Sequence, residues 1–189
     1  MCCGVVLVCD FIKLKSMKLY KFPFFLLPAL TFVFCHKEHK RPETIQEPKI
    51  VIVETQDDKR EEIVAFAKKY MGTKYCYAGG SPESGFDCSG FVNFVFKHFD
   101  MELPRSSSGF KNLGKPLKPE EFRVGDVLVF YGYRDRNSVG HVGIICEANG
   151  MKSKFIHSSS GKEMAVTISE LGSDMYTKRF YKCIDPFKI

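Results

Sequence analysis

The sequence is poor in the features that mark several common classes of protein. It has no C-x2-C pair, so a zinc site built on such a pair is not expected. It has no basic run and no aromatic repeat, and its formal charge of +6 is spread along the chain, which argues against binding to nucleic acid. It has no internal repeat, and outside residues 36–58 it has no low-complexity segment. No apolar run reaches the roughly 20 residues of a transmembrane helix.

What the sequence does contain is enough apolar material for one core. Hydrophobic residues make up 44% of the 189 residues, and 18 residues are phenylalanine. A chain of this length is typical of a single domain with a tail. We expect the domain to be globular and monomeric and to cover residues 59–189.

The first 35 residues have the layout of an export signal. From Met17, two lysines precede an apolar stretch over residues 22–34, so Met17 is a better start than Met1. Cys35 ends the stretch, where a bacterial lipoprotein carries its lipid, although Phe34 before it is bulkier than is usual at such sites. We expect export to the cell envelope, with membrane anchoring through a lipidated Cys35. The alternatives are a cleaved, secreted or periplasmic form and an uncleaved anchor.

Residues 36–58 carry alternating charges and two prolines, which is typical of a solvated tether. An apolar patch at residues 50–53 is a candidate edge strand within it. The folded domain follows, and we expect Asp57 or Asp58 to cap a first helix that stops at Gly72.

The rest of the domain is expected to be α+β, with helices first and an antiparallel sheet afterwards. A second helix is predicted over residues 88–99, because its apolar residues lie along one broad face. Short strand patterns then recur to the end of the chain. They fall at residues 125–132, 141–146, 154–158, 164–169 and 177–184.

One thiol, that of Cys88, lies where a loop runs into the start of the second helix. The unpaired N–H groups of a helix N-terminus favour a thiolate, so we expect a cysteine there to ionise near neutral pH. Two histidines follow in strand patterns, His141 and His157. A thiol, a base and a group that orients the base are the parts of covalent acyl transfer.

Each residue type at these positions also has a structural interpretation. Free cysteine is among the most often buried residues, and Cys76, Cys146 and Cys183 need only a packing role. His141 taken alone is as compatible with a packed imidazole as with a base. His98, near the end of the second helix, is interpreted as a partner of the helix dipole.

Strand parity bears on the catalytic hypothesis. His141 and His157 are equidistant from Asn149, so a hairpin centred there places them opposite each other on one face. That register pairs Val142 with Ile156. A two-residue turn that begins at Asn149 would instead point His157 to the other face. The catalytic hypothesis therefore predicts an odd-numbered loop or a bulge.

Several motifs occur in order between residues 60 and 184: YCYAGGSPESGFDCSGFV, LPRSSS, GDVLVF, HVGI and FIHSSS. Together they resemble the NlpC-type cell-wall peptidases. The resemblance implies a papain-like α+β fold, in which N-terminal helices pack on a central antiparallel sheet. The chain departs from the family pattern at Ala78, where a glycine is usual, and at Phe110, where a glutamine is frequent.

The resemblance also implies roles for individual residues. Cys88 would be the nucleophile, His141 the general base, and His157 the residue that orients His141. The residues that would steady the oxyanion or line the substrate groove are Tyr75, Asp87 and Ser89.

The activity implied by the resemblance is that of a cysteine endopeptidase that hydrolyses peptidoglycan stem peptides during remodelling of the wall. The bond cut would join D-γ-glutamate to the diamino acid, and no metal or organic cofactor would be needed. A mildly basic surface suits an acidic polymer of this kind. Two alternatives stay open: a non-catalytic lipoprotein that binds wall peptides, and an amidase or acyltransferase of related papain-like fold.

Overall fold

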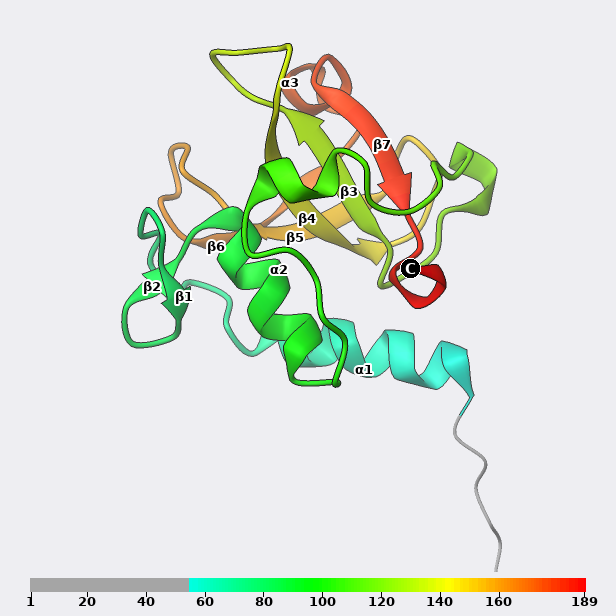
Figure 1. The fold of residues 1–189 in the computed structure, drawn as a ribbon, viewed down its shortest axis with the longest axis horizontal. Coiled ribbons are helices and arrows are strands. Elements are labelled where there is room, and N and C mark those ends of the chain that lie inside the picture. Colours follow the sequence, from blue (N-terminus) through cyan, green and yellow to red (C-terminus); the bar gives the residue numbers. More distant parts are fainter. Residues whose placement is uncertain (1–54) are drawn as a thin grey trace, which may run out of the picture. The chain divides into compact units, whose positions relative to one another are not determined.

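The computed structural model describes residues 55–189. The signal-like segment, Cys35 and the patch at residues 50–53 lie outside the described residues. Within the described range the fold is α+β, as expected: helices and a small hairpin come first, and a five-stranded antiparallel sheet follows (Figure 1). No helix in residues 55–189 has the length and apolar character needed to cross a membrane.

The helices and strands follow one another along the chain with short connections. The helices are α1 (Gln56–Lys68), α2 (Cys88–Lys97) and α3 (Asp174–Thr177), and the 3-10 turns are η1 (Ser107–Phe110), η2 (Pro119–Glu121) and η3 (Pro186–Lys188). The small hairpin is formed by β1 (Gly80–Ser81) and β2 (Gly85–Phe86). The main sheet contains β3 (Val127–Tyr131), β4 (Val139–Glu147), β5 (Lys154–Ser158), β6 (Val166–Glu170) and β7 (Phe180–Ile184).

The main sheet has the strand order β6-β5-β4-β3-β7, and every neighbouring pair is antiparallel. All five strands predicted from the sequence are confirmed, and β5 has the predicted bounds. Strand β7 begins at Phe180 rather than residue 177, because α3 and the turn after it occupy the start of that segment.

Helix α1 begins at Gln56, and its N-cap is Thr55. The Thr55 hydroxyl accepts a hydrogen bond from the N–H of Asp58, and the Asp58 carboxylate accepts one from the N–H of Thr55. This reciprocal pair is a capping box, in which Thr55 is the N-cap and Asp58 is the acidic residue at position N3. The prediction that Asp57 or Asp58 would cap the helix was therefore wrong.

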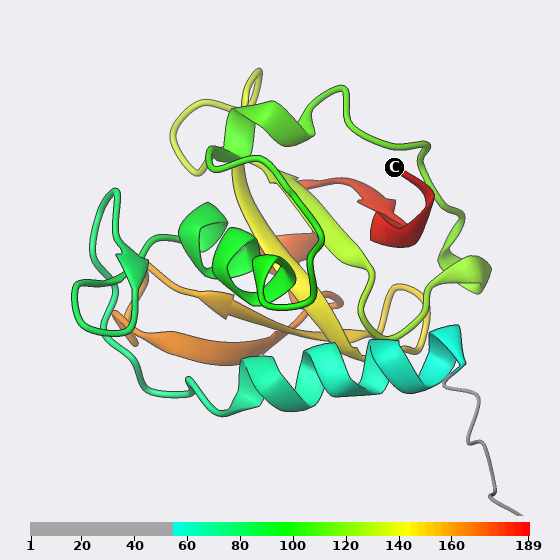
Figure 2. The same cartoon turned by 60° about the horizontal axis from the view of Figure 1, so that its bottom comes forward.

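Helix α2 lies on one face of the sheet, against β4 and β5, and α1 lies beside α2 (Figure 2). Four apolar side chains of α2 are fully buried and form one core cluster with side chains of the sheet. Burying each such side chain contributes about 1.5–3 kcal/mol. The helix residues in this cluster are Phe91, Val92, Val95 and Phe96, and the sheet residues beneath include Val142, Ile144 and Ile156.

A buried set of ion pairs ties α1 to the edge of the sheet. Arg60 of α1 is 2% exposed, and its guanidinium donates to the carboxylates of Asp126, at 2.7 Å, and Asp185. Arg123 donates a further hydrogen bond to Asp185, at 2.9 Å. Buried carboxylates without a positive partner are strongly destabilising, so Arg60 holds the position of both.

We predict that Arg60→Ala lowers the free energy of unfolding by about 3–5 kcal/mol, because it leaves two buried carboxylates without their main partner. Urea unfolding of the two proteins measures the difference. Lys68→Ala, which removes an exposed charge from the same helix, is the control and should cost less than about 0.5 kcal/mol. Equal losses in the two variants would contradict the role given to Arg60.

Candidate active site

Cys88 is the first residue of α2, as the sequence predicted. Asp87 is the N-cap of the helix, and its Oδ1 accepts a hydrogen bond from the N–H of Gly90 at 2.6 Å. The cap fixes the start of the helix, so the thiol is carried on a rigid element rather than on a loop.

The sulfur of Cys88 lies against the backbone of β4. Its Sγ is 3.9 Å from the carbonyl oxygen of Gly140, the residue before His141. The N–H of Val142, the residue after His141, also faces the sulfur. The thiol therefore sits beside the segment that carries His141.

Burial raises the pKa of the Cys88 thiol, and the negative charge of Asp87 raises it further. Backbone N–H groups of Val142, Ser89 and Cys88 itself act in the opposite direction but do not outweigh burial. The expectation that a cysteine at this helix N-terminus would ionise near neutral pH is therefore wrong. The resting residue is a thiol.

His141 and His157 form a hydrogen-bonded pair on neighbouring strands. Nε2 of His141 is 2.9 Å from Nδ1 of His157, and both rings are buried. Nε2 of His157 is in turn 3.0 Å from the hydroxyl of Ser169 and 3.4 Å from that of Tyr176. Both nitrogens of His157 are thus engaged, and Nδ1 of His141 is left to interact with a proton donor.

The register of the hairpin differs from the predicted one. Ile156 pairs with Ile144, two residues further along β4 than the predicted Val142. A shift of two residues keeps every side chain on the same face, and β4 and β5 also contain a bulge, one of the two irregularities that the catalytic hypothesis required. His141 and His157 are therefore diagonal rather than direct neighbours on that face.

Burial also sets the protonation of the two histidines. It lowers the pKa of His141 well below its ordinary value, and the positive charges of His157 in its protonated form and of Arg179 act in the same direction. It lowers the pKa of His157 to about 3, again with Arg179 as the second cause. Both imidazoles are neutral near pH 7, so His141 is able to accept a proton.

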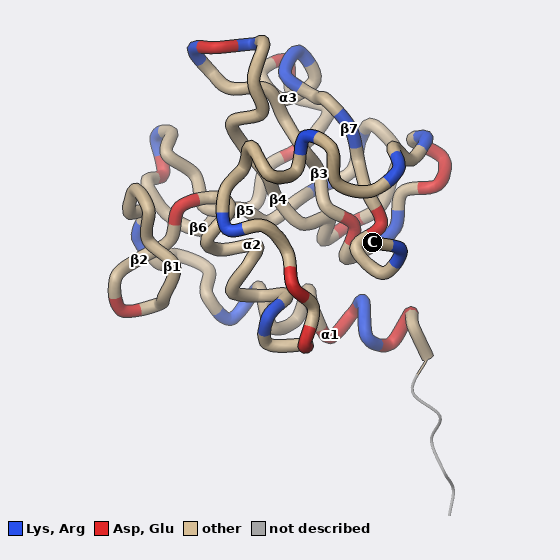
Figure 3. The backbone as a smooth tube through the Cα atoms, in the orientation of Figure 1, with Lys and Arg blue, Asp and Glu red and all other residues tan. Residues whose placement is uncertain are grey.

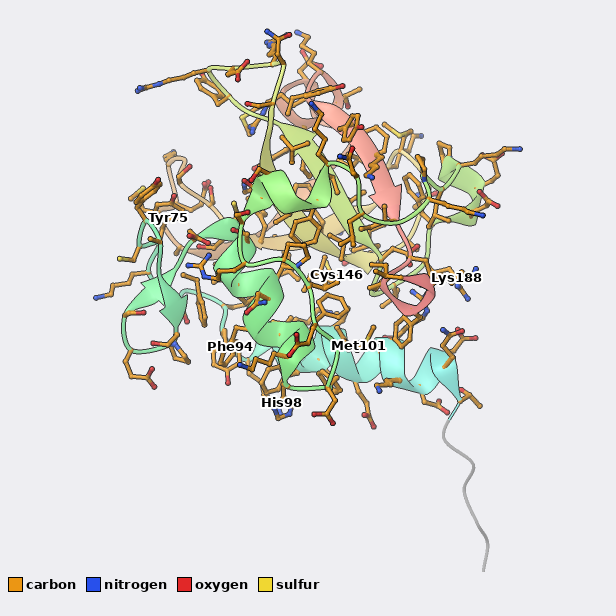
Figure 4. All side chains as sticks on the ribbon, in the orientation of Figure 1. Tyr75, Phe94, His98, Met101, Cys146 and Lys188 are labelled. Carbon is orange, nitrogen blue, oxygen red and sulfur yellow. The ribbon has the colours of Figure 1, made fainter. Side chains whose placement is uncertain are left out.

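Cys88 opens onto a groove of about 490 Å³. All three residues expected beside the nucleophile line it: Tyr75, Asp87 and Ser89. Tyr75 lies on the side of the molecule that carries β1 and β2 (Figure 4). Burial raises the pKa of its phenol, and the negative charges of Asp87 and of Cys88 in its thiolate form raise it further, so the hydroxyl keeps its proton.

The site thus combines a thiol at a helix start with a buried histidine pair on β4 and β5. The model of the NlpC/P60 family matches residues 72–185. The chain belongs to the NlpC/P60 family. The family shares the papain-like α+β fold that the sequence predicted.

Relatives and solved structures agree with this assignment. The chain is 34% identical over 118 residues to the gamma-DL-glutamyl hydrolase of Bacillus subtilis (strain 168). The match covers 62% of this chain and 27% of that protein. It is 33% identical over 124 residues to the murein DD-endopeptidase MepS/murein LD-carboxypeptidase of Escherichia coli (strain K12). That match covers 65% of this chain and 61% of that protein. A Staphylococcus aureus NLP/P60 family structure, described as similar to lipoprotein, has a TM-score of 0.59 and 27% identity, over 69% of this chain and 42% of that one. The chain thus spans less than two thirds of each of these proteins.

Arg105 is a groove residue to which the sequence analysis gave no role. Its Nη1 donates to both carboxylate oxygens of Asp87, at 2.9 and 3.1 Å, and its Nη2 donates to the carbonyl oxygens of Ala78 and Gly79, at 2.6 and 2.9 Å. Arg105 therefore joins the helix cap to the loop that carries Tyr75. Its signal in the sequence was the LPRSSS motif.

Two positions of the family pattern now have a physical explanation. Ala78 has a φ of 59°, in the left-handed region, where a glycine avoids a cost of about 1–2 kcal/mol. Gly143, in the HVGI motif, leaves room for His157: a Cβ there would be 2.6 Å from the ring of Phe155 and 3.0 Å from the Cβ of His157. Phe110, the other departure from the pattern, is fully buried in the core.

His98 is the C-cap of α2, and its ring stacks on Phe66 with centroids 3.9 Å apart. Its interaction with the helix dipole stays a prediction. Among residues 55–189, no three histidine, cysteine, aspartate or glutamate side chains gather as metal ligands would. All four cysteines of that range are free: Cys76 and Cys88 are partly buried, and Cys146 and Cys183 are buried.

We predict that the histidine pair makes the fold sensitive to acid. Because the folded pKa of His157 is about 3, below its ordinary value of 6.5, its contribution to stability is complete above pH 6.5 and decreases as the pH falls towards 3. At about pH 5, the shifted pKa of His157 alone should lower the free energy of unfolding by about 2 kcal/mol relative to neutral pH.

Urea unfolding at about pH 7.5 and about pH 5 tests this prediction. His157→Gln should lose less stability on acidification than the wild type. His98→Gln, which removes an exposed histidine, should behave like the wild type. The same pH dependence in His157→Gln and in the wild type would refute the prediction.

Proposed function

We propose that the chain is a cysteine endopeptidase that hydrolyses peptidoglycan stem peptides. Cys88 is the nucleophile, His141 the general base and His157 the residue that positions His141. The observation that carries the proposal is the hydrogen-bonded series from Ser169 through His157 to His141. His141 follows Gly140, whose carbonyl oxygen is 3.9 Å from the sulfur of Cys88, and Cys88 lines a groove.

The first half of the reaction forms a thioester. Nδ1 of His141 takes the proton from Cys88 as the sulfur attacks the scissile carbonyl carbon. The oxyanion is stabilised by the N–H of Cys88 at the helix start, with the protonated hydroxyl of Tyr75 as a second donor. His141 then gives its proton to the leaving amine, and the C–N bond breaks.

The second half of the reaction releases the acid. Water loses a proton to His141 as it attacks the thioester carbonyl, and the thiol leaves with that proton. Since burial raises the pKa of Cys88 and lowers that of His141, both residues begin each half-reaction uncharged. Proton transfer therefore accompanies bond formation, and a preformed ion pair is not needed.

The names of relatives support a wall peptide as substrate. The Bacillus subtilis relative is named a gamma-DL-glutamyl hydrolase, which supports cleavage between D-γ-glutamate and the diamino acid. The Escherichia coli relative is named for DD and LD bonds, so the experiment must report which bond is cut. Action outside the cytoplasm follows from such a substrate, and the signal-like segment with Cys35 supports export and a lipid anchor.

The test is mass spectrometry of purified peptidoglycan after incubation with the full chain in mild detergent. We predict new fragments cut after D-γ-glutamate, and a loss of at least about 1,000-fold in rate for Cys88→Ala, because the nucleophile is removed. Lys97→Gln, which changes an exposed charge at the far end of α2, is the control and should cut like the wild type.

Three other outcomes of the digestion would change or contradict the proposal. Fragments cut only at DD cross-links would keep the peptidase and change its bond. Fragments of equal amount from Cys88→Ala would remove Cys88 from the mechanism. No fragments from any protein, on walls of both diamino-acid types and with the thiol reduced, would support a binding protein or an acyltransferase instead.

A further inference from the structure

Three arginines gather where the loop between β3 and β4 meets the turn between α3 and β7. Arg134 and Arg136 are exposed on the loop, and Arg179 is the residue before β7. Figure 3 shows basic positions on both sides of an acidic one in this loop, and further basic positions where α3 runs into β7. Arg134, Arg136 and Arg179 are called the arginine cluster below.

The arginine cluster has no anionic partner in the part of the chain that the structure describes. The other arginines of that part, Arg60, Arg105 and Arg123, each form an ion pair with an aspartate. Over residues 55–189, no carboxylate oxygen lies within 4.0 Å of a nitrogen atom of the cluster. The unpaired arginines are therefore gathered in one place.

Asp135, the acidic residue of this loop, is engaged within the loop itself. Its Oδ1 accepts a hydrogen bond from the N–H of Asn137 at 2.9 Å, and its Oδ2 accepts one from the hydroxyl of Ser138 at 2.5 Å. The carboxylate of Asp135 thus shapes the loop and forms no ion pair with the arginines on either side of it.

Arg179 is the recessed member of the cluster. It is 9% exposed, and its Nε donates to the carbonyl oxygen of Tyr131 at 3.0 Å. Its terminal nitrogens, Nη1 and Nη2, donate to no described residue. Both reach the surface, because the only fully buried side-chain nitrogen or oxygen without a partner among residues 55–189 is Nε of Arg60. The outer edge of the Arg179 guanidinium is therefore open to a ligand.

A positive charge at the position of Arg179 is costly to keep. Burial lowers the pKa of its guanidinium, and the positive charge of Arg136 acts in the same direction. The group stays charged all the same, since the pKa of an arginine begins so high. A buried charge without a partner destabilises a fold, and an anion bound at Nη1 and Nη2 would offset that cost.

We propose that the arginine cluster is a binding site for a flexible polyanion, a chain that carries phosphate or carboxylate groups at intervals. One such group is held by Nη1 and Nη2 of Arg179, because a guanidinium fork matches two oxygen atoms of a phosphate or carboxylate. Neighbouring groups of the chain contact Arg134 and Arg136. The inference goes beyond the proposed hydrolysis and does not depend on it.

The depth of Arg179 selects the shape of the partner. A flat anionic surface, such as a membrane, can contact the exposed Arg134 and Arg136 but not a guanidinium that is 9% exposed. A flexible chain can insert a single charged group beside Tyr133, whose ring centroid is 5.8 Å from the guanidinium carbon of Arg179. The mildly basic composition of the chain favours an acidic polymer as well.

The arginine cluster lies close to the groove but not in it. Tyr131, which accepts the bond from Arg179, precedes Gly132, and Gly132 packs against Gly140: a Cβ on Gly140 would be 2.6 Å from the Cα of Gly132. Gly140 lines the groove beside Cys88, whereas no arginine of the cluster does. A bound polymer would therefore hold the enzyme beside its surroundings without filling the groove.

The test uses fluorescently labelled poly(glycerol phosphate) and poly(L-glutamate) with the same number of charges. Each is titrated with the full chain in non-ionic detergent at neutral pH, and binding is followed by fluorescence anisotropy. We expect binding whose affinity falls with salt with a log–log slope of about −2, because three contacts release about 0.7 counterion each. The polymer that binds more tightly identifies the anionic group. Binding of neither polymer, or binding that does not depend on salt, would overturn the proposal.

Variants assign the binding to the arginine cluster. Arg179→Gln should weaken binding at least about tenfold, because it removes charge-assisted hydrogen bonds. Arg179→Lys keeps the charge without the fork, so it should keep the salt slope and lose part of the affinity. Arg136→Gln changes an exposed loop residue that the fold tolerates, and it should weaken binding about threefold and reduce the slope by about 0.7.

Lys97→Gln is the matched control, since it removes one exposed positive charge at the end of α2, far from the loop between β3 and β4 (Figure 1), and it should bind like the wild type. An equal loss in Lys97→Gln and Arg179→Gln would show an effect of net charge and overturn the site. Weaker binding in Arg136→Gln with unchanged binding in Arg179→Gln would also overturn it, because that pattern is expected of a flat contact such as a membrane.

Discussion

The packing of α2 against the sheet is the contact on which the site depends. Cys88 belongs to the helix and His141 to β4, and no short stretch of chain joins them. Their relative position is set by the apolar face of α2, where Phe91 and Val95 pack on the core residues of the sheet. A protein core is close-packed, so this interface admits little sliding, and the thiol stays beside the histidine.

The same packing explains the electrostatics of the site. It removes Cys88, His141 and His157 from water, and burial favours the uncharged form of each. The N–H groups at the helix N-terminus lower the pKa of the Cys88 thiol, but burial raises this pKa by more. The proposed mechanism accordingly transfers the proton as the new bond forms, and two charged groups beside the thiol, Asp87 and Arg105, are paired with each other.

Much of the fold and of the candidate site could be predicted from the sequence, because helix patterns, strand patterns and motifs are local. The five strands, the start of α2 and the pairing of the two histidines on one face all follow from periodicity and parity. The hairpin register could not be predicted, because the bulge depends on tertiary contacts.

The role of Ser169 as a partner of His157 could have been predicted. Thr167 pairs with His157, so Ser169, two residues further along β6, lies on the same face of the sheet. Tyr176 gave no signal, since it lies in the short α3, and the pKa of Cys88 depends on burial, which a sequence does not display.

The central claim is that Cys88 and His141 act as one unit, and alkylation of the thiol tests it most directly. The measurement is the rate of iodoacetamide modification of Cys88 near neutral pH in the wild type and in His141→Gln, with the site located by mass spectrometry and Cys76 as the internal reference thiol. The account predicts that loss of the base slows modification of Cys88 by about 100-fold and leaves Cys76 unchanged. Equal rates at Cys88 in the two proteins would contradict it.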